Sequence, residues 1–187
     1  MPANVVIAYP QGAVWDDAIV PGFAFEHGGT APTFVTFPAG QSTGLYQCNG
    51  TDAFHWIVQL PHSIITVPIT GVPGAITLRP HVHWTMVANP TAGQTLTWAI
   101  DYVLAKKDGT FASTVTTLTA PAYTTVGDEI RKHLTTQIGD LSAEVGPSTL
   151  VIGRLYLSAV PASQNPLVIA FDFHFQKGPF GTIAETA

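Results

Sequence analysis

Two short stretches of the chain alternate apolar and polar residues with a period of two, which is the pattern of a half-buried β-strand. In Leu78–Met86, one predicted face carries Leu78, Val82, Trp84 and Met86, and the other carries Arg79, His81, His83 and Thr85. In Leu167–Gln176, the predicted apolar row is Leu167, Ile169, Phe171, Phe173 and Phe175, opposed by Val168, Ala170, Asp172, His174 and Gln176. Each stretch is therefore expected to turn one face to the core and the other, with its histidines and charges, away from it.

Further strand patterns begin at Phe54. The candidates are Phe54–Leu60, Ile64–Thr70, Ala75–Ala88, Thr95–Lys106, Thr110–Thr119, Leu150–Ala159 and Leu167–Gln176. Pro80 predicts a bulge or an edge position in its strand. Lys107-Asp108-Gly109 predicts a hairpin turn that leads into the return strand Thr110–Thr119. Residues 126–145 fit both a helical stripe and a strand, and their β-rich surroundings favour a strand.

About eight strands separated by regular turns predict an all-β fold, an antiparallel β-sandwich of the jelly-roll-like kind. Residues 51–187 would form this sandwich as one domain. Residues 1–50 carry turn residues every few positions, between short apolar pieces. They are predicted to form an extended N-terminal arm that packs on its own domain or on a neighbouring subunit. Aromatic residues recur in this arm, which argues against low-complexity disorder.

The low charge content adds a prediction about assembly. Only 10% of the residues are charged, against about 25% in an ordinary soluble domain. No apolar run reaches the roughly 20 residues of a membrane span, so we expect no membrane partner. A net charge of −5 argues against nucleic acid as a partner. We therefore expect an obligate assembly subunit, whose surface is covered by other protein molecules.

The sequence carries no signature of a catalytic site. It has no Gly-x-Ser-x-Gly elbow, phosphate-binding loop or dinucleotide-binding fingerprint. Its single cysteine, Cys48, has no catalytic signature around it and is expected to be a small buried residue. We expect no catalytic residue, no enzymatic activity and no cofactor.

Histidines provide the candidate metal ligands. His81 and His83 alternate on a strand and so point the same way, and His174 with Asp172 could join them from a neighbouring strand. Such a set would suit zinc, or iron or manganese in an open site. Histidines on the polar face of a sheet commonly form hydrogen bonds without a metal, so the sequence favours no metal. If an ion is held, a structural role is favoured over catalysis.

Isolated charges within apolar strands are costly unless they are paired. This leads to a second hypothesis, a single buried polar layer that a neighbouring subunit closes. Its members would be Arg79, His81, His83, Asp101, Arg154, Asp172 and His174.

Four segments carry a family resemblance. They are Leu60-Pro61-His62, Pro80-His81-Val82-His83-Trp84, Gly153-Arg154-Leu155-Tyr156 and Phe171-Asp172-Phe173-His174-Phe175. Their order resembles that in structural proteins of tailed-bacteriophage virions, over about residues 52–178. The resemblance implies a capsid decoration (cement) protein that is a homotrimer and bridges subunits of the major capsid protein. Such a protein would be assembled in the host cytoplasm and lie on the capsid exterior of the virion.

Two other functions stay open. The chain could be a tail fibre, spike or adsorption component that binds the host surface. It could also be a cupin-like metal-binding enzyme, since the pair His81 and His83 partly matches the cupin motif. The usual cupin carboxylate is missing, because Trp84-Thr85-Met86-Val87 follows His83 where a Glu would be expected.

Overall fold

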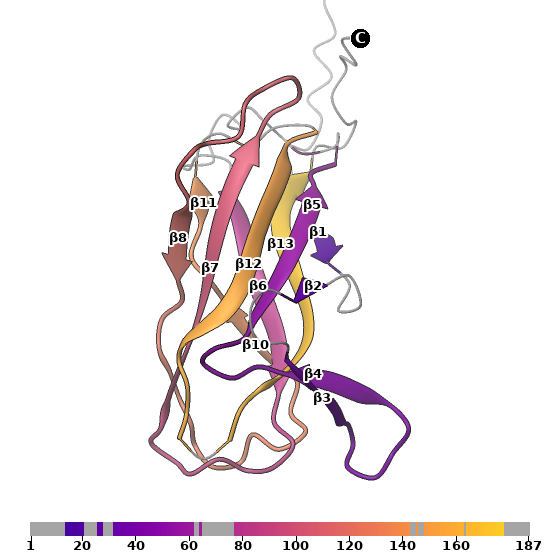
Figure 1. Cartoon of the computed structure of the whole chain (residues 1–187), viewed down its shortest axis with the longest axis vertical. Helices are drawn as coiled ribbons and strands as arrows, with labels where there is room; N and C mark the ends of the chain where they lie inside the picture. Colours follow the sequence, from indigo (N-terminus) through magenta and orange to yellow (C-terminus); the bar gives the residue numbers. More distant parts are fainter. Residues whose placement is uncertain are drawn as a thin grey trace, which may run out of the picture.

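The computed structural model describes residues 14–20, 26–27, 32–61, 64, 77–142, 145, 148–162 and 164–177. These residues form two antiparallel β-sheets packed face to face, and no helix (Figure 1). The first-half strands are β1 (Val14–Val20), β2 (Glu26–His27), β3 (Thr33–Thr36), β4 (Gly44–Gln47), β5 (Ala53–Gln59), β6 (Thr77–Thr85) and β7 (Thr95–Ala105). The later strands are β8 (Thr116–Thr119), β9 (Tyr123–Thr124), β10 (Leu134–Gln137), β11 (Leu141–Ser142), β12 (Leu150–Ala159) and β13 (Leu167–Lys177). The predicted all-β sandwich is confirmed.

The order of the strands is that of a jelly roll. One sheet runs β10-β6-β13-β4-β3, with β1 also paired to β13 and β11 to β6. The other runs β2-β5-β12-β7-β8, with β9 also paired to β7. Among the eight strands β4, β5, β6, β7, β8, β10, β12 and β13, the chain crosses between the sheets at every connection except β7 to β8. This is the double Greek-key arrangement by which a jelly roll closes its two sheets over one core.

The core lies between the sheets and is built from the predicted apolar faces. The apolar row of β6 and the bridge residue after it (Leu78, Val82, Trp84 and Met86) is fully buried. Trp56 of β5 reaches across the sandwich to Phe171 and Phe173 of β13, with ring centroids 5.1 Å away in both cases. Burying an aromatic or large aliphatic side chain of this kind contributes roughly 1.5–3 kcal/mol. These contacts between the sheets therefore dominate the stability of the fold.

The predicted apolar row of β13 is wrong at Ile169, whereas Leu167, the first residue of the row, is buried. A register shift between Val168 and Ala170 places an extra residue, Ile169, opposite β6. As a result Val168, not Ile169, joins the core beside Phe171. A bulge of this kind interrupts the alternation of side chains between the two faces of the strand. Strict alternation from Leu167 onwards could not reveal it.

The predicted hairpin after β7 is confirmed at the turn and wrong at the return strand. Gly109 N–H donates to the Lys106 carbonyl at 2.9 Å, and Asp108 has a φ of 61°. Pairing with β8, however, resumes only between Tyr102 and Thr116. Residues 110–115 are exposed and form a loop, in which Phe111 and Val115 are 38% and 61% exposed instead of packing in the core.

Residues 126–142 contain strands, as the β-rich surroundings predicted, and no helix within this described range. β10 pairs with residues 81–84 of β6, and β11 pairs with residues 77–78. Ile138 between them is fully buried. The apolar residues that suggested a helical stripe thus fill the edge of the sandwich.

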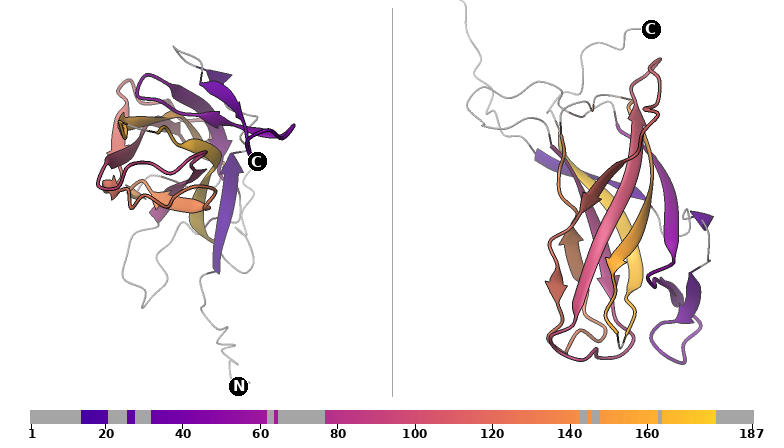
Figure 2. Two further views of the ribbon diagram at one scale, coloured as in Figure 1. Left: turned by 90° about the horizontal axis from the view of Figure 1, so that it is seen from below. Right: turned by 60° about the vertical axis from the view of Figure 1, so that its left-hand side comes forward.

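The N-terminal segments contribute strands to the seven-stranded sheet. β1 pairs with residues 171–177 of β13, and β4 pairs with residues 167–168 of the same strand. The β3–β4 hairpin projects from the side of the sandwich (Figures 1 and 2). The predicted strand Ile64–Thr70 lies outside the described residues except for Ile64, which is buried. Within the described residues, no helix could span a membrane.

Candidate functional site

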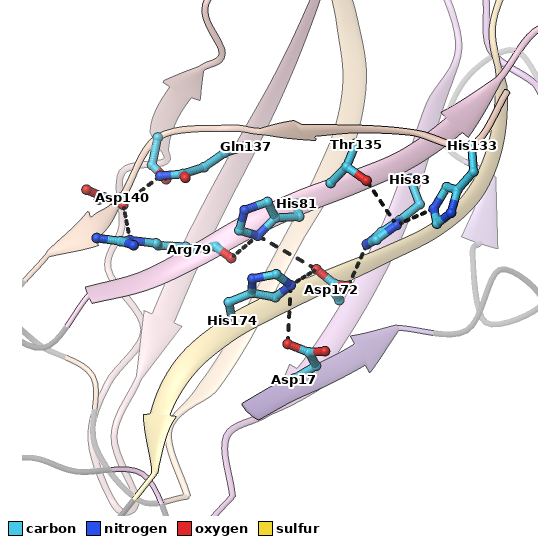
Figure 3. Close-up of polar contacts among 11 residues, drawn as sticks. Asp17, Arg79, His81, His83, His133, Thr135, Gln137, Asp140, Asp172 and His174 are labelled. Carbon is cyan, nitrogen blue, oxygen red and sulfur yellow. Dashed lines mark hydrogen bonds and ion pairs between the residues drawn. The ribbon is translucent and has the colours of Figure 1, made fainter. Parts of the chain in front are cut away.

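The histidine-rich faces of β6 and β13 meet because these strands are neighbours. The register pairs His81 with Asp172, and Arg79 with His174. The residues of β6 that alternate with Arg79, His81 and His83 are buried, so His81 and His83 point away from the core. Figure 3 shows the resulting group, with Asp172 between the histidines of both strands. The predicted association of His81, His83, Asp172 and His174 is present in the structure.

Asp172 is the central residue of this group, and its side chain is only 7% exposed. Its Oδ2 accepts a hydrogen bond from His83 Nε2 at 2.8 Å. Its Oδ1 is buried and has no hydrogen-bond partner. The nearest imidazole nitrogens to Oδ1 are His174 Nε2 at 3.5 Å and His81 Nδ1 at 3.9 Å. A buried carboxylate oxygen without a partner is costly, so this atom is unusual.

His81 and His174 stack beside that oxygen. Their ring centroids are 3.8 Å apart, with 30° between the planes. His81 Nδ1 is also 3.0 Å from the Arg79 carbonyl oxygen, to which the neutral ring can donate. Burial lowers the pKa of His81, and the nearness of His174 lowers it further. Both effects favour the uncharged form of the His81 ring.

His83 extends the group towards β10. Its Nδ1 lies 2.7 Å from His133 Nε2, so one of the two nitrogens carries the shared proton. The hydrogen bond to Asp172 raises the pKa of His83 above its usual value. His133 was not predicted to belong to this group, because the sequence of residues 128–133 is typical of a solvated segment of mixed charge. No pattern in the sequence marks His133, because its position depends on the pairing of β10 with the histidine segment of β6.

Asp17 joins from β1. Its Oδ1 lies 3.2 Å from His174 Nε2, and the register pairs the two residues directly. No pattern in the sequence places β1 beside β13, and adjacent carboxylates such as Asp16 and Asp17 are typical of solvated turns. The structure places Asp17 in a strand, where its side chain can contact His174.

The seven residues of the predicted polar layer do not form one layer. Arg79 pairs with Asp140 at 3.2 Å on the seven-stranded sheet, beside the histidines. Asp101 and Arg154 lie in the other sheet, on β7 and β12, where Arg154 contacts the Asp101 Oδ2 at 2.7 Å. The error arose because each polar stripe faces away from the core, and the two sheets turn these faces in opposite directions. His62, of the segment Leu60-Pro61-His62, lies outside the described residues.

The outward face of the six-stranded sheet carries an apolar row. The register aligns Ile57 of β5, Ile152 of β12 and Val103 of β7 across three neighbouring strands. Ile57 is 63% exposed, and Val115 beside β7 is 61% exposed. The row borders a hollow of about 430 Å³, lined by His55, Asp101, Tyr102, Val103, Val115, Ile152, Gly153 and Arg154. This face combines exposed apolar side chains with a rim of charged ones.

Cys48 is fully buried, as predicted, and burial raises the pKa of its thiol. A buried, protonated thiol is a poor nucleophile.

In comparisons with known proteins, no family model matches the sequence and no curated protein is significantly similar to it.

Proposed function

We propose that this chain is a non-enzymatic structural protein of a tailed-bacteriophage virion, and that it decorates the capsid. Three features support the proposal. The four segments of the sequence resemble virion structural proteins, the strand order is a jelly roll, and only 10% of the residues are charged. Jelly rolls recur in virus shells, although a fold alone does not define a function.

The observation that carries the proposal is the apolar row on the outward face of the six-stranded sheet. Ile57, Ile152 and Val103 are in register on three strands, so together they form a continuous surface. Apolar side chains gathered on a sheet face mark a site of contact with another protein. The charged pair Asp101 and Arg154 borders this row, as polar residues border the centre of an interface.

A decoration protein stabilises a shell by burying apolar surface between itself and the molecules that it contacts. Each exposed apolar side chain that becomes buried contributes about 25 cal/mol per Å², and many copies bound over one shell add their contributions. The row would therefore pack against a capsid subunit or against a second copy of the chain, and so hold neighbouring subunits together.

A cupin-like enzyme has less support. Small-molecule sites are usually enclosed pockets, and in this sandwich Trp56, Phe171 and Phe173 fill the space between the sheets. The histidine group lies on the outward face of its sheet instead. That position suits a structural site better than a substrate pocket.

The first experiment measures copy number. Virions of the phage that encodes this chain would be purified, and the chain would be quantified on a gel against the major capsid protein. A decoration protein is expected at a copy number comparable with that of the capsid protein. A few copies per particle would instead indicate a tail fibre or adsorption component, and absence from the particle would contradict any virion role.

The second experiment tests the apolar row. Ile57→Lys places a charge in this row, at its most exposed side chain, and is expected to abolish binding to virions that lack the wild-type chain. Val126→Lys is a matched control, because Val126 is 64% exposed and lies two residues after Thr124, which pairs with Thr95 at the other end of β7 from Val103. Equal binding by both folded variants would contradict the role of the row.

A further inference from the structure

We infer that His81, Asp172 and His174 bind one divalent transition-metal ion of the zinc class. One nitrogen or oxygen atom from each residue lies within 4.8 Å of the others. The residues come from β6 and β13, so a bound ion would join these strands on the outward face of their sheet. This inference does not depend on the proposed virion role. It departs from the sequence-based expectation that the chain holds no metal.

The distances suit a small ion. Donor atoms bound to a tetrahedral zinc at about 2.0–2.1 Å are about 3.3 Å from one another. Asp172 Oδ1 lies 3.5 Å from His174 Nε2 and 3.9 Å from His81 Nδ1. These pairs are too far apart for good hydrogen bonds, yet contractions of a few tenths of an ångström would bring them to the spacing of zinc ligands.

The unpartnered oxygen of Asp172 is the independent sign of a ligand. Oδ1 is buried without a hydrogen bond, whereas Oδ2 of the same carboxylate is well bonded to His83. Native structures rarely leave such an atom unsatisfied, and an ion is one of the explanations for it. The two stacked imidazoles each direct one nitrogen to the side of this oxygen (Figure 3). A cation bound there would satisfy it.

The protonation states also fit. A histidine ligand must be neutral, and burial already favours the neutral ring of His81. Binding through Nδ1 would move the ring proton to Nε2 and replace the hydrogen bond to the Arg79 carbonyl. His83 would hold the second carboxylate oxygen of Asp172 in place, which is the usual role of a residue that positions a metal ligand.

The ligand types indicate which ion is expected. Two imidazoles with one carboxylate suit zinc, and suit ferrous iron or manganese in open sites. Nitrogen-rich sites bind zinc more tightly than manganese. Asp17 Oδ1 lies 3.2 Å from His174 Nε2 but outside the group of three, so it would have to move towards the ion to act as a fourth ligand.

The test uses the full chain without a polyhistidine tag, stripped of metal by a chelator. Zinc binding is measured by calorimetry and elemental analysis, and cobalt(II) absorption in the visible range reports tetrahedral coordination. We expect one ion per chain and weaker binding of manganese. At about a hundredfold excess of zinc over its Kd, the unfolding temperature should rise by about 5 °C or more.

Variants separate this site from surface binding. His174→Ala and His81→Gln should weaken zinc binding at least about a hundredfold, and His83→Gln should weaken it about 10–100-fold by loss of positioning. His55→Ala removes an exposed histidine on the other sheet and should bind as the wild type does. The inference is overturned if the wild type shows no thermal shift with zinc, cobalt or iron(II). It is also overturned if folded His174→Ala binds zinc as tightly as His55→Ala.

Discussion

Glu129 is a fully buried carboxylate that holds together the loop before β10. It accepts hydrogen bonds from the Val126 N–H at 2.6 Å, the Gly127 N–H at 3.0 Å and the Tyr123 hydroxyl at 3.1 Å. Burial acts to raise the pKa of Glu129, but these hydrogen bonds outweigh it and lower the pKa below the usual value. Burial and the contact with Glu129 raise the pKa of Tyr123 to about 12. The charged form of Glu129 therefore stabilises the folded state.

The sign of this shift predicts a pH dependence. Because the folded-state pKa of Glu129 lies below its ordinary value of 4.5, the stabilisation is complete above that pH and is lost as the pH falls through the folded-state pKa. Glu129→Gln should lower the free energy of unfolding by about 1–3 kcal/mol at pH 7. It should also flatten the loss of stability in acid, as measured by urea unfolding from pH 7 to pH 3.

The control is Asp128→Asn, which alters the neighbouring carboxylate; Asp128 is exposed and pairs with Lys132 at 2.7 Å on the surface. Surface pairs of this kind contribute about 0–1 kcal/mol. If both variants show the same acid sensitivity as the wild type, Glu129 is not the stabilising carboxylate.

Gly153 is a residue of β12 where no side chain fits. A Cβ built there would clash with the Asp101 carbonyl oxygen and approach Trp56 Cζ2 to 2.5 Å. Gly153→Ala should therefore lower the free energy of unfolding by about 1–3 kcal/mol, as overpacking does. At Gly50, an added Cβ would meet Val160 at an ordinary 3.5 Å, so Gly50→Ala should change stability by less than about 0.5 kcal/mol. Denaturant unfolding of the two variants side by side would check this, and equal midpoints would contradict it.

At the scale of elements, Asp101 links three strands of the six-stranded sheet. Its Oδ2 accepts from Arg154 Nε of β12 at 2.8 Å, and its Oδ1 accepts from Thr117 of β8 at 2.6 Å. The Asp101 side chain is 14% exposed, whereas both partners in the pair Arg79–Asp140 are more than a third exposed. Asp101→Ala should cost about 2 kcal/mol, since it removes several hydrogen bonds to a charged group.

The matched control for Asp101→Ala is Asp140→Ala, which should cost no more than about 1 kcal/mol. Both costs would be measured as free energies of unfolding in urea at neutral pH. Similar costs for the two variants would show that the contacts of Asp101 contribute no more than a surface ion pair.

Local patterns predicted individual strands well and their partners poorly. The alternation in Leu78–Met86 correctly separated buried Trp84 from the outward His83, because burial of one face dictates that pattern directly. The group of His81, His83, Asp172 and His174 followed from assuming that two similar stretches are neighbours. Asp101 was misplaced because the sequence does not state which sheet a strand enters.

Irregular features of the fold could not be predicted from the sequence, for a different reason. The bulge at Ile169 depends on how β13 packs against β6. A run of apolar residues has the same sequence pattern in a bulged strand and in a regular one. Asp17 and His133 could not be assigned to the histidine group, since both depend on edge pairings formed by segments distant along the chain. Tertiary contacts, rather than local preference, decide such positions.

At the scale of the whole molecule, the low charge content determines how any assembly should respond to salt. The chain has 19 charged residues out of 187, seven of them basic and twelve acidic. Contacts between opposite charges weaken as salt shortens the screening length from about 8 Å at 0.15 M to about 3 Å at 1 M. Contacts between apolar surfaces such as that of Ile57, Ile152 and Val103 are not weakened in this way.

The proposed virion role therefore predicts that the chain stays bound to virions in 1 M NaCl. The measurement is the fraction of the chain that sediments with purified particles at 0.15 M and at 1 M salt, which should be the same or higher at 1 M. Ile57→Lys should fail to sediment with particles at either concentration, because it removes the apolar contact itself. Release of the wild-type chain at 1 M NaCl would mean that charged groups hold it, and the apolar row would then lose its assigned role.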